Sequence, residues 1–91
     1  MIVLKSSREL SILREAGRIS AKALRLAGEA AQPGVSTYEI DKIVHDFIKK
    51  SGAEPGFLNL YGFPASACIS VNNEVIHGIP SKKKILKEGD I

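Results

Sequence analysis

The sequence lacks most of the features that mark specialised classes of protein. It has a single cysteine, Cys68, among 91 residues, so it can form no internal disulfide. No apolar run approaches the roughly 18 residues that a membrane-spanning helix needs. The N-terminus has no apolar core followed by a small-residue cleavage site, as a secretory signal would have. These absences predict a soluble protein of the cytoplasm.

The sequence also lacks a large excess of charge of either sign. The formal net charge is +3, which is too small and too dispersed for the basic patch of a nucleic-acid-binding protein. The densest basic stretch is the Lys82-Lys83-Lys84 run, and three lysines fall short of such a patch. We therefore interpret this run as a solvated loop, and we predict neither a membrane partner nor a specific nucleic-acid partner.

Metal-binding and phosphate-binding motifs are missing as well. The two histidines, His45 and His77, are far apart in the chain, and no HExxH or CxxC motif is present. The glycine before the second predicted helix is alone and makes no phosphate loop. We predict no metal site within these residues, and we expect His45 to be an exposed surface side chain without a partner.

What the sequence does contain begins with two capped helices. Ser6 and Glu9 form a Ser-x-x-Glu capping box ahead of a stripe of mostly small residues, which predicts a helix that packs closely on a neighbour. Ser36 and Glu39 form a second box, and Gly52 suits the position after the helix end. The second helix carries an apolar stripe without a miss: Ile40, Ile43, Val44, Phe47 and Ile48.

The remainder is predicted to contain a loop and strands. Residues 53–66 are rich in proline, glycine and aromatics, which predicts an apolar loop that is tucked under the fold or lines a pocket. Cys68–Val71 and Val75–Ile79 are β-prone and flank a turn at Asn72-Asn73, and a further strand starts at Ile91. The predicted fold class is α+β with an antiparallel hairpin. Because the chain stops where a strand begins, residues 1–91 are interpreted as an incomplete single domain.

His77 leaves several alternatives open at this point. In the predicted hairpin it lies opposite Cys68, so the two could form a nucleophile pair. No third residue that would orient such a pair is identifiable. A buried cysteine is commonly a small apolar filler, and from these residues alone a satisfied core histidine is the favoured interpretation of His77.

Four segments together are more specific than any of these motifs. The segments REAGRISAKAL, PGVSTYEIDKIVHDFI, YGFPASACISVNNEVIHGIP and LKEGDI resemble the type I (bacterial) methionine aminopeptidases over the whole chain. The resemblance implies the N-terminal part of a pita-bread fold, whose antiparallel sheet cups the active site. It also implies the hydrolytic removal of initiator methionine from nascent chains with the help of two divalent metal ions (Co, Mn, Fe or Zn). Contact with the ribosome surface and a cytoplasmic location are further expectations from the resemblance.

The resemblance also assigns residue roles. His77 matches a histidine that contacts the substrate around the scissile peptide and binds no metal. Phe57, Leu60, Phe63 and Cys68 match positions that line the pocket for the methionine side chain. Leu60 departs from the pattern, because an aromatic residue is common there. The family's two aspartates, one histidine and two glutamates that bind metal have no match in residues 1–91, so we expect this chain alone to be inactive.

Two other readings stay open. A non-catalytic relative of the same fold could act as a binding module for protein or RNA, and would lack the five metal ligands. A free-standing α+β domain would be a monomer with a closed core. The fragment interpretation instead predicts self-association through an exposed sheet edge and apolar face.

Overall fold

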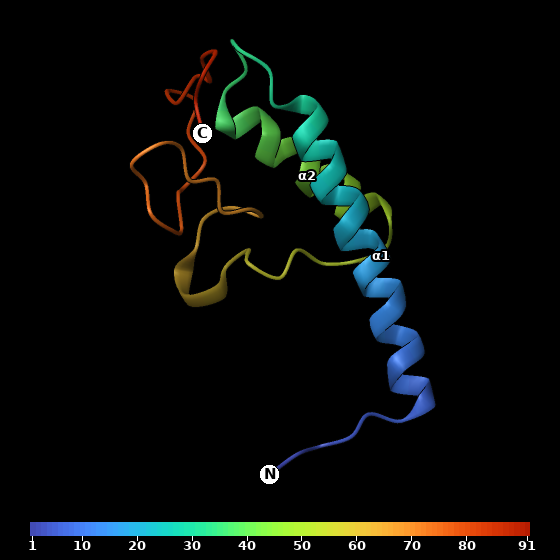
Figure 1. The fold of residues 1–91 in the computed structure, drawn as a ribbon. Helices are drawn as coiled ribbons and strands as arrows, with labels where there is room; N and C mark the ends of the chain where they lie inside the picture. Colours follow the sequence, from blue (N-terminus) through green and yellow to red (C-terminus); the bar gives the residue numbers. More distant parts are fainter.

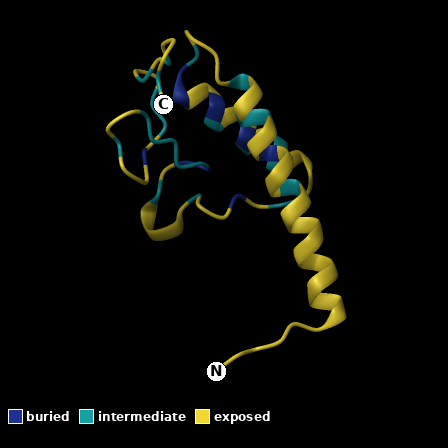
Figure 2. Cartoon of the chain, viewed as in Figure 1, coloured by how far each residue is buried: buried dark blue, intermediate teal, exposed yellow.

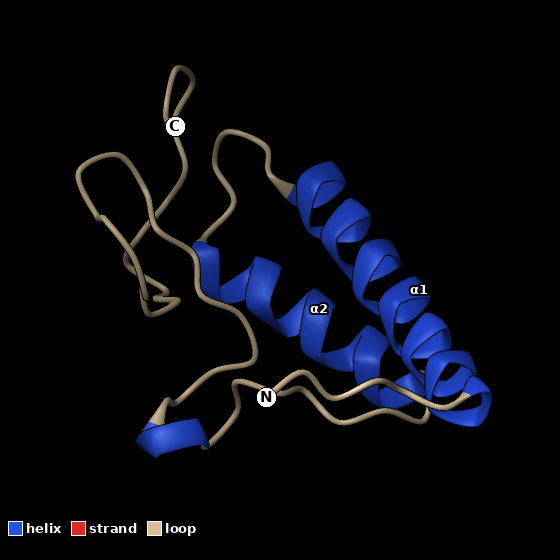
Figure 3. Cartoon of the chain, turned by 60° about the horizontal axis from the view of Figure 1, so that its bottom comes forward, coloured by secondary structure: helices blue, strands red, loops and turns tan.

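The computed structural model describes residues 1–91 as two packed helices followed by a long, irregular segment (Figure 1). Helix α1 spans Ser7–Ala30, helix α2 spans Thr37–Lys50, and one 3-10 turn, η1, spans Leu60–Gly62. The two helices pack against each other, and the segment from η1 to the C-terminus lies on the side of α2 away from α1 (Figure 3). No helix is both long enough and apolar enough to cross a membrane.

The caps of α1 are as the sequence predicts. Ser6 accepts a hydrogen bond from the N–H of Glu9, and the Glu9 carboxylate accepts one from the N–H of Ser6, which completes a capping box. The Ser6 N–H, and after it the Ser6 hydroxyl, favour the charged carboxylate and lower the pKa of Glu9 from its ordinary value of 4.5. The first turns of α1 extend away from the rest of the molecule and are exposed throughout (Figure 2). Only Ala23 of this helix is buried, where it meets α2.

Helix α2 is held at both ends. Ser36 accepts from the N–H of Glu39, but the reciprocal bond of a capping box is replaced by one from the Ser36 hydroxyl to the Glu39 carboxylate. Gly52 follows the C-terminus with φ 80°, the left-handed conformation expected there. The predicted apolar stripe faces inward at Ile40 and Val44, which are buried, whereas Ile43 stays 41% exposed.

The predicted strands are absent, and this part of the fold prediction is wrong. No residue belongs to a strand, and the segments around the expected hairpin are loops (Figure 3). The turn itself forms: the N–H of Glu74 bonds the carbonyl of Val71, and Asn72 has φ 54°. Beyond it, one backbone bond joins the two arms, from the N–H of Ile69 to the carbonyl of Gly78. The predicted register would instead pair Ile69 with Ile76.

Side chains take the backbone donors that a ladder would use, which explains the missing hairpin. The N–H of Val71 bonds the Glu74 carboxylate at 2.8 Å, and the N–H of Gly78 bonds the Ser70 hydroxyl at 3.0 Å. The predicted strand start at Ile91 is likewise a loop, and its N–H bonds the side-chain oxygen of Asn72. Side-chain acceptors thus take several of the backbone donors that cross-strand pairing would use in this segment.

The irregular segment is anchored at the start of α2. Residues 84–86 run antiparallel beside residues 34–37, with one isolated bridge between Ser36 and Ile85. Thr37 is fully buried there, and its hydroxyl both accepts from the N–H of Ser81 at 2.9 Å and donates to the carbonyl of Ser81 at 3.3 Å. The N-terminus of α2 therefore fixes a loop that lies more than forty positions further along the chain.

Candidate functional site

A large apolar groove separates the helices from the irregular segment. Its volume is about 1160 Å³, and more than half of its lining residues are hydrophobic. The helices contribute the Ala23 and Ile40 faces, and the irregular segment contributes Cys68, Ile69 and the chain end at Ile91. The groove is far larger than one methionine side chain needs. Only part of it can serve as a side-chain pocket, and the rest is an open apolar face of the two helices.

Three of the four predicted pocket residues line this groove. Phe57, Leu60 and Cys68 come from separate parts of the irregular segment and all border it. Phe63 is not among the lining residues, but its ring lies 6.2 Å from that of Phe57 in a tilted arrangement. The structure thus brings together the two phenylalanines, and it places Phe57, Leu60 and the free thiol of Cys68 on one groove.

The loop that carries Leu60 is shaped by left-handed residues. Asn59 has φ 65° and Tyr61 has φ 49°, so η1 is one distorted turn. The N–H of Asn59 bonds the carbonyl of Phe63 at 2.8 Å, which closes the loop on itself. Leu60 and Phe57 remain about half exposed, while Tyr61 points fully into solvent. An aromatic residue is therefore available beside Leu60, but it does not face the groove.

His77 lies outside the groove, on an exposed loop. Its backbone has φ 54°, in the left-handed region, which costs a non-glycine residue about 1 kcal/mol or more. The next residue, Gly78, is buried against Ile69 and Ser70: a Cβ on Gly78 would lie 2.1 Å from the Ile69 carbonyl oxygen. The close packing of Gly78 on the backbone of Ile69 and Ser70 therefore restricts the backbone position of His77. The predicted pairing of His77 with Cys68 is not the backbone contact observed.

His45 makes a long-range polar contact that the sequence did not predict. It was expected to be exposed and without a partner, but it is half-buried, and its Nδ1 lies 2.7 Å from the Ser66 hydroxyl. One turn earlier on α2, the Asp41 carboxylate accepts the N–H groups of both Ser66 and Ala67. These contacts tie the residues just before Cys68 to α2. The i, i+4 spacing of Asp41 and His45 was the available signal, but their partners lie too far away in sequence to be predicted.

The metal chemistry that the resemblance implies has no ligand set here. No three His, Cys, Asp or Glu side chains lie together in an arrangement that could hold a metal ion. Asp90, which precedes the chain end, bonds the Asn72 side chain and the N–H of Lys87, and these contacts lower its pKa from the ordinary value of 3.8. The residues present do not fit a metal centre, so no step of a reaction is assigned to one.

The candidate site therefore consists of an apolar groove bordered by Phe57, Leu60 and Cys68, and a separate exposed loop that carries His77. Comparison with known proteins identifies the class of protein. Residues 11–91 match the family described as metallopeptidase family M24. The chain belongs to this family.

Its relatives are bacterial enzymes. The chain is 53% identical to the methionine aminopeptidase of Clostridium perfringens and 50% identical to methionine aminopeptidase 1 of Bacillus subtilis, in both cases over its full length. It superimposes on the crystal structure of the Thermotoga maritima methionine aminopeptidase with a TM-score of 0.95 at 37% identity, over 100% of this chain. The Rickettsia prowazekii enzyme gives 0.92 at 38% identity over 99%. The chain spans 36% of the length of each of these four proteins.

Proposed function

We propose that the protein removes the N-terminal methionine from newly made polypeptides, and that these 91 residues supply contacts to the substrate. The observation that carries the proposal is the convergence of Phe57, Leu60 and Cys68 on one apolar groove, in a chain that matches methionine aminopeptidases over its full length. A thioether side chain binds well among aromatic rings and polarizable sulfur. This part of the groove suits a methionine side chain.

His77 is the proposed contact to the scissile peptide. Its exposed loop position leaves the imidazole free to donate to a substrate carbonyl, and donors aimed where charge develops lower a barrier by a few kcal/mol. Its left-handed backbone is consistent with a residue held for function, because strained residues gather at active sites. Within the proposed reaction His77 binds and orients the substrate and does not bind metal.

The cofactor and the setting complete the proposal. The family name implies metal, and we propose divalent ions such as Co, Mn, Fe or Zn, bound by residues other than those of this chain. The substrates are N-terminal methionine peptides and nascent chains. The site of action is the cytoplasm near the ribosome surface, where nascent chains emerge. On this proposal the 91 residues alone form part of one domain and have no activity.

The test compares the 91-residue chain with the full-length protein, meaning the whole polypeptide encoded by the gene that carries this sequence. Each is incubated with a Met-Ala-Ser peptide and each of the four metals, and released methionine is measured. We expect release by the full-length protein only. Release by the 91 residues would contradict the proposed division of roles. A full-length protein that binds the peptide without cleaving it would favour the binding-module alternative.

Self-association of the 91-residue chain stays a prediction. Because the structure has no sheet edge, the open groove is the surface that would mediate it. The groove exposes an apolar face that a stable monomer rarely shows. Light scattering over a range of concentrations tests it. A well-behaved monomer at every concentration would contradict the prediction.

A further inference from the structure

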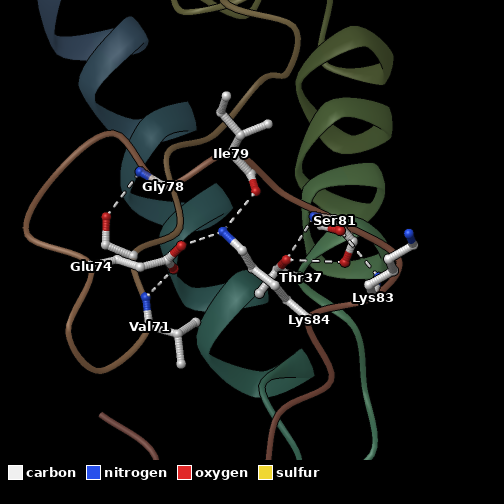
Figure 4. Close-up of polar contacts among 9 residues, drawn as sticks. Thr37, Val71, Glu74, Gly78, Ile79, Ser81, Lys83 and Lys84 are labelled. Carbon is white, nitrogen blue, oxygen red and sulfur yellow. Dashed lines mark hydrogen bonds and ion pairs between the residues drawn. The ribbon is translucent and has the colours of Figure 1, made fainter.

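The Lys84 side chain contacts the loop that carries His77 on both sides of the histidine. The Lys84 ammonium forms an ion pair with the Glu74 carboxylate, and it also donates to the carbonyl of Ile79 at 3.3 Å (Figure 4). Glu74 lies three residues before His77, and Ile79 lies two residues after it. A single ammonium group thus ties together both arms of the loop.

The Glu74 carboxylate makes a second hydrogen bond within the loop. The other oxygen of Glu74 accepts the N–H of Val71 at 2.8 Å, which closes the turn at the loop's beginning. Both bonds favour the charged carboxylate, so the Lys84 ammonium, and after it the Val71 N–H, lower the pKa of Glu74 from its ordinary value of 4.5. Lys84 and Glu74 are about one-third exposed, so the pair is partly shielded from water.

Lys84 itself is fixed to a rigid element. Its carbonyl accepts the N–H of Thr37 at 2.9 Å, at the N-terminus of α2. The Thr37 hydroxyl bonds both backbone groups of Ser81, three residues earlier (Figure 4). The position of Lys84 is therefore set by a helix, and its side chain transmits that position to the loop.

We propose that Glu74 and Lys84 are positioning residues for His77: together they hold the loop in the shape that presents the imidazole to the substrate. This proposal rests on the proposed function of His77. Neither side chain needs to contact the substrate. Their effect is to restrict the orientation of His77. The backbone of His77 has φ 54°, a conformation that a non-glycine residue keeps only when its surroundings hold it there.

The test uses the full-length protein and the Lys84→Met variant, which keeps the length of the side chain and removes its charge. We expect kcat on Met-Ala-Ser to fall by roughly tenfold or more, because small displacements of a substrate-orienting group are costly. Lys84→Arg should restore most of the activity, since it can still bond the Glu74 carboxylate. Lys83→Met is the matched control, because the Lys83 side chain points away from Glu74 (Figure 4). It should leave kcat unchanged.

A double-mutant cycle separates positioning from general stability. In a His77→Ala background, Lys84→Met should have almost no further effect on kcat, because the residue it positions is gone. An equal fold-loss in both backgrounds would overturn the proposal, and so would an unchanged kcat for Lys84→Met alone. If the wild-type protein released no methionine, the proposed function would fail first.

Hydrogen exchange tests the role of Lys84 and Glu74 even if the wild-type protein releases no methionine. Hydrogen exchange of the Val71 amide should accelerate in Glu74→Gln and in Lys84→Met and not in Lys83→Met. Equal exchange rates at Val71 in all three variants would show that Lys84 and Glu74 do not hold the loop, and this result would count against the proposal independently of any activity measurement.

Discussion

The helical half and the irregular half of the chain are held together in different ways. Residues 7–50 form helices through bonds between neighbours in sequence, whereas residues 51–91 depend on side chains that reach distant backbone groups. The helices supply a rigid support, and the irregular half presents the candidate site residues. The difference indicates that a few long-range polar contacts position the candidate site residues, and the experiments that follow change single contacts in each half of the chain.

The largest effect is expected from Gly78→Ala. The added Cβ would lie 2.1 Å from the Ile69 carbonyl oxygen and 2.8 Å from the Ser70 Cα, so the backbone must move. Turnover of Met-Ala-Ser by the full-length protein should fall by roughly a hundredfold. Helix content, measured by far-UV circular dichroism, should not change. A variant with near-normal turnover would show that the close approach does not position His77.

Thr37→Val removes the anchor between the two halves while keeping the shape of the side chain. The N–H and carbonyl of Ser81 lose their partner at a buried site, which should cost about 2 kcal/mol of unfolding free energy. Urea unfolding of the full-length protein measures this loss. Thr37→Ser keeps the hydroxyl and serves as the control. Equal losses for both variants would mean that packing, and not the hydroxyl, provides the anchor.

The two helix caps offer a comparison within the helical half. Ser36→Ala should cost about 1 kcal/mol, because Ser36 is buried and caps the helix that bears the anchor. Ser6→Ala removes an equivalent cap from the exposed end of α1, where fraying affects little else. We expect a clearly smaller loss for it. A larger loss of unfolding free energy for Ser6→Ala than for Ser36→Ala would contradict the view that the start of α2 supports the fold and the start of α1 does not.

The smallest effect concerns pH. The folded pKa of Glu74 is lowered from 4.5, so its ionised form stabilises the fold. That stabilisation is fully present above the unfolded value and is lost as the pH falls through the folded value. Carbon NMR of the Glu74 carboxyl should give a midpoint below 4.5 in the wild type and a higher one in Lys84→Met. A wild-type midpoint at or above 4.5 would contradict the observed contacts.

Sequence signals predicted the helices because their causes are local. The Ser6–Glu9 box and the Gly52 stop involve residues three or four apart, and both form as predicted. The hairpin prediction failed beyond its turn at Asn72, because Glu74 and Ser70 take the backbone donors that strands would share. β-propensity alone cannot reveal that competition.

The resemblance named the residues of the candidate site, whereas the contacts that hold these residues in place were not foreseen. The resemblance selected Phe57, Leu60, Phe63 and Cys68, and all of these except Phe63 border one groove. Their roles, like that of His77, remain predictions. The contacts of Asp41, His45 and Lys84 could not be foreseen, because each reaches a residue at least five positions away in the sequence, and only the fold brings such residues together.

The most direct test of the central claim is His77→Ala in the full-length protein. If this chain supplies the substrate contact and other residues supply the metal site, kcat/KM on Met-Ala-Ser should fall by about two orders of magnitude. The bound metal, measured by elemental analysis, should equal that of the wild type. Loss of bound metal in the variant, or unchanged kcat/KM, would contradict the account.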